Sequence, residues 1–170
     1  MRHLVIGLCV FATAFAGAAP TAPASSLGSL VGGGGTAVTA AEGASELPFR
    51  GNLQATERVA GALHHLVGSG NGTHLGRLRY AADLTINEQT GVGVGTVTWT
   101  AANGDQIFAQ TTGEIVSLNF PTLTLRETQI ITGGAGRFRN ASGTITVNRT
   151  LDLVTHATTG SFTGTLNLGH

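Results

Sequence analysis

The sequence contains few of the residues on which common protein chemistry depends. It has a single cysteine, Cys9, no lysine, four prolines, and only 5% aromatic residues. One cysteine near the N-terminus leaves the rest of the chain without a disulfide, a thiol nucleophile or a cysteine-ligated metal. Charged residues make up 11% of the chain and the formal net charge is zero. This balance argues against nucleic acid as a partner, because nucleic-acid-binding proteins carry a basic excess.

Low charge also argues against a disordered chain, since disorder requires high charge and low hydrophobicity. The 26 glycines show no three-residue period, which excludes a collagen-like protein. No apolar run reaches the roughly 20 residues that a membrane-spanning helix needs. We therefore expect a folded protein with no membrane span.

The N-terminal residues have the pattern of an export signal. A short basic start precedes an apolar run over residues 4–15, and small residues with A-x-A spacing follow. This pattern predicts a signal peptide over residues 1–19, cleaved between Ala16 and Ala19. The protein is then expected to be secreted or associated with the cell envelope.

Residues 20–46 consist mainly of Ala, Gly, Ser and Thr. Such a segment buries too little apolar surface to offset the entropy lost on ordering. We interpret it as a flexible linker. The remaining residues, 47–170, have the length of one domain.

From Leu47 onward, alternation of apolar and polar residues predicts β-strands throughout. Threonine, valine and isoleucine, which fit a pleated sheet, become frequent. Asn103-Gly104 predicts a type I′ hairpin, and helical spacing over residues 52–67 leaves a partly helical segment as an alternative. The predicted strands cover residues 48–58, 62–69, 74–86, 92–101, 105–117, 121–132, 137–151 and 158–168.

Eight sequential antiparallel strands predict an all-β fold, a closed β-barrel. Closure pairs the edge strands, which would otherwise remain exposed. A sandwich of two sheets is the alternative. An eight-stranded barrel is either filled by side chains or wide enough for one small ligand.

Three segments together resemble secreted bacterial proteins with an allene oxide cyclase-like barrel, which plant allene oxide cyclases and dirigent proteins share. The resemblance covers residues 47–168 and implies an eight-stranded antiparallel barrel. It carries no catalytic residue across to this chain. Related plant barrels form dimers or trimers, so it also implies a homo-oligomer as one alternative. The segments are Pro48-Phe49-Arg50-Gly51, Gly72-Thr73-His74-Leu75-Gly76-Arg77, and Gly133-Gly134-Ala135-Gly136-Arg137-Phe138 with Ala141-Ser142-Gly143.

Other motifs favour structural roles. The glycines of 133–136 have neither the following helix nor the lysine of a phosphate loop, and predict a turn with positive φ. Arg137 either anchors a carboxylate ligand or locks this turn by pairing with a carbonyl or an acid. The histidines lack metal-ligand spacing, so we expect no metal. His64 and His65 are adjacent and would point to opposite faces of a strand.

Four polar residues interrupt apolar faces and are our candidate ligand-binding residues: Glu57, Tyr80, Glu127 and Arg149. If these faces line the barrel, the charges must pair or meet water. One interpretation is the polar end of an apolar pocket. The other is a structural Glu–Arg pair or a position at the solvent-exposed rim.

Three functions remain open at this point. The barrel could bind a small apolar or amphipathic molecule, with the four candidate residues orienting its polar end. By resemblance, it could instead be an isomerase or cyclase that needs no cofactor. It could also be a filled structural barrel without a ligand.

Overall fold

The computed structural model describes residues 46–169 of the chain. The predicted signal peptide and nearly all of the predicted linker lie outside the described residues. The described part consists of eight strands and one short 3₁₀ helix, η1. The strands are β1 (Leu47–Ala60), β2 (Leu63–Gly72), β3 (Gly76–Asn87), β4 (Val92–Ala101), β5 (Gln106–Asn119), β6 (Thr122–Ala135), β7 (Ser142–Asp152) and β8 (Ala157–Asn167), and η1 is Gly136–Phe138.

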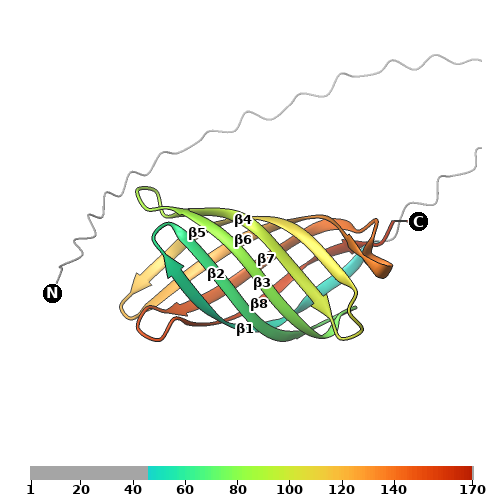
Figure 1. The fold of residues 1–170 in the computed structure, drawn as a ribbon, viewed down its shortest axis with the longest axis horizontal. Coiled ribbons are helices and arrows are strands. Elements are labelled where there is room, and N and C mark those ends of the chain that lie inside the picture. The colour runs from blue at the N-terminus through green and yellow to red at the C-terminus, as the bar shows by residue number, and fades with distance from the viewer. Residues whose placement is uncertain (1–45, 170) are drawn as a thin grey trace, which may run out of the picture. The chain divides into compact units, whose positions relative to one another are not determined.

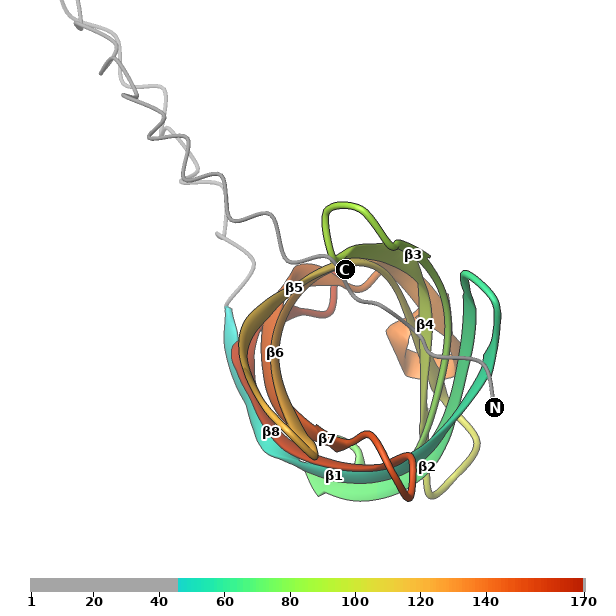
Figure 2. The ribbon, with the colours of Figure 1, turned by 90° about the vertical axis from the view of Figure 1, so that its left-hand side faces the viewer.

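The strands form one closed antiparallel barrel in sequence order, and β8 pairs with β1 to close it. Figure 1 shows the strands tilted along the barrel, and Figure 2 shows the closed ring. The predicted fold class is confirmed. The sandwich alternative is wrong, and so is the partly helical alternative for residues 52–67, which form β1 and β2.

The Asn103-Gly104 hairpin differs from the prediction. Gly104 has a φ of 91°, but Asn103 is not among the residues with positive φ, whereas a type I′ turn needs positive φ at both central positions. The amide of Gly104 donates to the carbonyl of Ala101 at 3.0 Å, and that of Ala101 to the carbonyl of Asp105 at 2.8 Å. The connection is therefore a three-residue loop that ends in a left-handed glycine.

The predicted strand 137–151 also begins too early, because Gly136–Phe138 forms η1 and β7 starts only at Ser142. Gly133 and Gly136 have the positive φ expected of this segment. Arg137 donates to the carbonyl of His74 and lies 3.5 Å from the Asp105 carboxylate, so it has the turn-locking role. No helix of residues 46–169 has the length and apolar character needed to cross a membrane.

The interior of the barrel is divided along its axis. The half nearer η1, which we call the η1 end, is filled by aromatic side chains. The Trp99 and Phe162 ring centroids are 4.7 Å apart, and those of Tyr80 and Trp99 are 4.8 Å apart. Phe138 of η1 is fully buried there. We call the opposite half the cavity end. The β1–β2, β3–β4, β5–β6 and β7–β8 connections lie at this end of the barrel.

Candidate functional site

Strand alternation turns three charged residues into the barrel. Glu57 lies on β1, Glu127 on β6 and Arg149 on β7, each at the same parity as buried apolar residues of its strand. Each is at most 4% exposed. Residues far apart in sequence meet here because β6 pairs with β7, and β7 is separated from β1 only by β8.

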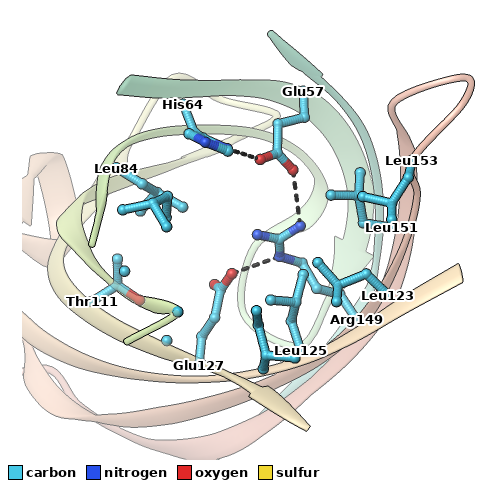
Figure 3. Close-up of a pocket in the computed structure, with 15 residues that line it drawn as sticks. Glu57, His64, Leu84, Thr111, Leu123, Leu125, Glu127, Arg149, Leu151 and Leu153 are labelled. Carbon is cyan, nitrogen blue, oxygen red and sulfur yellow. Dashed lines mark hydrogen bonds and ion pairs between the residues drawn. The ribbon is translucent and has the colours of Figure 1, made fainter. Parts of the chain in front are cut away.

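Arg149 joins the two carboxylates (Figure 3). Its Nε donates to Glu127 at 2.6 Å, and its Nη1 donates to Glu57 at 3.2 Å and to the Thr158 hydroxyl at 3.4 Å. Burial by itself acts to lower the pKa of Arg149, but Glu127 and then Glu57 outweigh it and raise that pKa above its ordinary value. The guanidinium is therefore held charged, as pairing of buried charges requires.

Glu127 is connected in turn to the aromatic half of the barrel. The side-chain amide of Gln129 donates to Glu127 at 3.3 Å, and the indole N–H of Trp99 donates to the Gln129 carbonyl at 3.0 Å. All of these groups are buried. This chain of hydrogen bonds fixes the orientation of the Glu127 carboxylate.

His64 of β2 completes the cluster, and the sequence analysis did not include it among the candidates. Its Nδ1 forms a short hydrogen bond with the Glu57 carboxylate. Its side chain is 20% exposed, whereas that of Glu57 is 3% exposed. As predicted, His65 points the other way, and bonds to Asp83 on the outside. The sequence signal for His64 is its shared parity with the buried Leu66.

Tyr80 does not join the other three candidates. It is 1% exposed, packs against Trp99 in the aromatic half, and is not part of the cavity wall described below. Its hydroxyl has no hydrogen-bond partner among residues 46–169. Burial, and next the Glu127 carboxylate, raise the pKa of Tyr80 well above its ordinary value.

A cavity of about 120 Å³ lies at the cavity end, with the charged cluster on its wall. The residues that line it are Glu57, His64, Leu84, Ile86, Gly91, Gly93, Thr111, Gly113, Ile115, Leu123, Leu125, Glu127, Arg149, Leu151 and Leu153. Leu84, Glu127 and Arg149 are buried, whereas lining residues nearer the end of the barrel, such as Ile115 close to the β5–β6 connection, are exposed. The cavity therefore opens toward the strand connections of the cavity end.

Glycines at inward positions of the strands provide part of this space. A Cβ at Gly93 would lie 2.6 Å from the Ile86 Cδ1, and one at Gly113 would lie 3.1 Å from the Glu127 Cγ. Side chains at these places would fill the cavity or displace its wall. Gly93 and Gly113 thus keep this half of the barrel open.

The side chains present suit polar recognition and proton transfer more than metal binding. Among residues 46–169, no group of three or more His, Cys, Asp or Glu side chains is placed to hold a metal ion. The chain matches no protein-family model, no curated protein and no solved structure.

The pairing of Arg149 can be tested by an Arg149→Met substitution. Methionine keeps an unbranched side chain but leaves Glu57 and Glu127 as buried charges without their partner. We expect the free energy of unfolding to fall by about 3–5 kcal/mol, measured by urea denaturation followed by circular dichroism. Changing both glutamates to glutamine in the same protein should restore much of this loss.

The matched control is Arg126→Met on the exposed face of β6, where Arg126 Nε donates to the Asn148 side chain at 3.5 Å. That change should alter the free energy of unfolding by no more than about 0.5 kcal/mol. Equal losses in the two variants would contradict the role assigned to Arg149.

The burial of Tyr80 predicts how the protein responds to alkali. Tyr80 is the sole tyrosine in the sequence, so tyrosinate absorbance reports on it alone. Because its pKa is raised in the folded state, the unfolded chain loses the phenolic proton above about pH 10 while the folded chain retains it. Stability should therefore fall as pH rises above about 10, and tyrosinate should appear only with unfolding. Ordinary titration of the native protein would contradict this burial.

Proposed function

We propose that this barrel binds a small, mainly apolar molecule in the cavity beside Glu57, Glu127 and Arg149. The observation that carries the proposal is an apolar cavity whose wall includes one localised polar cluster, Glu57, His64, Glu127 and Arg149. Ligand sites commonly combine apolar walls with a few precisely placed polar groups. Here the leucines and isoleucines would hold the body of the ligand, and the cluster would orient its polar end.

The size of the cavity limits the part of a ligand that is enclosed. Its 120 Å³ is close to the roughly 150 Å³ of an engineered apolar cavity that accepts benzene. An enclosed portion of about six to eight non-hydrogen atoms is consistent with this volume. Because the cavity opens toward the hairpins, a longer molecule would extend out between them.

The unfilled cavity favours this proposal over a purely structural barrel. The η1 end is filled to the axis by aromatic rings, whereas glycines occupy inward positions at the cavity end. A barrel selected only for stability would gain from filling that space, since cavities cost stability in proportion to their volume. We propose further that the chain belongs with the secreted allene oxide cyclase-like barrels that it resembles.

Ligand binding can be tested with N-phenyl-1-naphthylamine, an apolar dye that fluoresces when it leaves water. Leu125→Trp should fill the cavity and weaken dye binding by about tenfold or more, because the lost space removes burial of the ligand. The matched control is Ile130→Trp, on the same strand but on the outer face, where Ile130 is 58% exposed. Equal binding by the two variants would contradict a site inside the barrel.

A second candidate is an enzyme that uses acid–base chemistry, and the His64–Glu57 pair favours it. A carboxylate that fixes Nδ1 of a histidine leaves Nε2 free to take or give a proton. Nε2 of His64 has no hydrogen-bond partner among the described residues. By resemblance, the reaction would be an isomerisation or cyclisation in which the shape of the cavity steers the substrate.

The enzyme candidate predicts that His64→Gln separates binding from turnover. Compounds that displace the dye would be incubated with the protein and analysed by chromatography. An enzyme would convert at least one of them, and His64→Gln would lose about 100-fold or more in rate with little change in affinity. Binding of all these compounds without any product would contradict catalysis and leave the binding function.

A further inference from the structure

Exposed apolar side chains gather at the cavity end of the barrel. Phe120, in the β5–β6 connection, is 77% exposed, and Val154, in the β7–β8 connection, is 65% exposed. The ends of β1 and β5 add exposed aliphatic side chains at the same place. We call this set the apolar rim, and its members are Val59, Ile115, Val116, Leu118, Phe120 and Val154. Apolar residues that gather in one place, rather than scattering singly, mark a surface that meets a partner.

The rest of the described surface differs from the apolar rim. Figure 1 shows the four connections of the cavity end together at the left. The connections at the η1 end contain none of the exposed large hydrophobic residues, and carry Arg137 and Arg139 instead. The outer wall of β1, β7 and β8 is mainly polar, with Arg, Asn, Gln and Thr at outward positions. An apolar partner would therefore meet this barrel end-on, at the cavity end, and not along its wall.

The apolar rim is continuous with the wall of the cavity. Ile115 belongs to both. Leu118 of the rim is the ladder partner of Leu123 in the cavity wall, and Val154 follows Leu153, which also lines the cavity. The mouth of the cavity thus opens within the apolar surface. A folded protein seated on this surface would close the mouth, whereas a fluid lipid layer would leave it open to molecules dissolved in the lipid.

The charges at this end indicate which kind of lipid surface fits it. The four connections are residues 61–62, 88–91, 120–121 and 153–156, and apart from one histidine their sole ionisable residue is Glu88. In the adjoining parts of the strands, Arg58 and Arg126 are offset by Glu114 and Asp152. Anionic headgroups are recognised by clusters of Lys and Arg, and this end has none. A zwitterionic surface, which is bound through buried apolar area, matches it better.

We infer, on the basis of the proposed binding function, that the apolar rim docks the barrel end-on to a zwitterionic lipid surface, from which the apolar ligand enters the cavity. Phe120 and Val154 insert between the lipids, and the polar outer wall stays in water. A small apolar molecule leaves water for lipid, so the ligand is most concentrated at the surface on which the barrel docks. The cavity mouth lies against that surface, and the ligand passes without crossing water.

The test is flotation of the intact protein with phosphatidylcholine vesicles, at about 0.1 M and about 1 M sodium chloride. The protein should float with the vesicles at both salt concentrations, because salt screens attraction between exposed charges and leaves apolar burial intact. The rim variant, Phe120→Ser with Val154→Ser, should bind vesicles about tenfold or more weakly, because two exposed side chains no longer gain burial in lipid.

The matched control, the wall variant, is Phe108→Ser with Val67→Ser. It removes the same two residue types from exposed positions on the outer wall, on β5 and β2, and should bind vesicles as the original protein does. Val154→Ser and Val67→Ser as single changes repeat the comparison with less effect on folding, which circular dichroism checks in every variant.

Several results would overturn the inference. Among them are no binding to phosphatidylcholine vesicles, binding that requires anionic phosphatidylglycerol and is lost at high salt, and equal losses in the rim and wall variants. Sedimentation without lipid tests a second copy of the chain as the partner. An oligomer that ignores vesicles and that the rim variant alone dissociates would also overturn the inference.

Dye binding in the absence of vesicles tests the proposed function separately. Phe120 and Val154 do not line the cavity, so the rim variant should still bind N-phenyl-1-naphthylamine. A protein that binds the dye inside the barrel but no vesicles would overturn the docking inference alone. A protein that binds vesicles but no dye would overturn the proposed function, and with it the passage of a ligand from the lipid.

Discussion

Arg149 places a positive charge between two carboxylates inside the barrel, and the rest of the site depends on that contact. Its Nε bonds to Glu127 of β6 and its Nη1 to Glu57 of β1, so one side chain connects strands on both sides of β8. Buried ion pairs are poor sources of net stability when compared with apolar packing. Their presence beside an open cavity is better explained by what they do to its chemistry.

The two halves of the barrel interior are ordered by different interactions. Aromatic rings fill the η1 end, where Phe49, Trp99 and Phe162 lie within 6.2 Å of one another between ring centroids. This half is ordered mainly by the packing of its rings, with the Trp99 indole N–H bonded to Gln129. At the cavity end, inward glycines and half-exposed leucines leave space, and order is supplied by the hydrogen bonds around Arg149. A stable half thus supports a half that remains open.

The period of two in a β-strand explains how much of this could be predicted from sequence. It correctly turned Glu57, Glu127 and Arg149 inward, because a strand residue has only two faces to choose from. It could not give the height of each residue along the barrel axis, which depends on the register between strands. For that reason strand parity alone places Tyr80 with Glu57, Glu127 and Arg149. In the structure it lies opposite Trp99 in the aromatic half instead.

The features that the sequence analysis missed are tertiary ones. His64 acquires its place beside Glu57 only when β1 and β2 pair. The start of β7 is delayed because Phe138 is buried at the end of the barrel, which favours a turn of helix over continued strand. The loop between Ala101 and Asp105 has three residues, one more than the predicted two-residue turn. The preference of Asn-Gly for tight turns does not distinguish the two lengths.

One consequence follows from the hydrogen bonds that lead from Trp99 through Gln129 to Glu127. Trp99 is the sole tryptophan of the chain. The side chains of Gln129 and Glu127 connect its indole N–H to the Arg149 guanidinium through hydrogen bonds. The emission of an indole responds to the electric field along its ring. The fluorescence of Trp99 therefore reports on changes of charge at Glu127 and Arg149, although Trp99 itself lies outside the cavity wall.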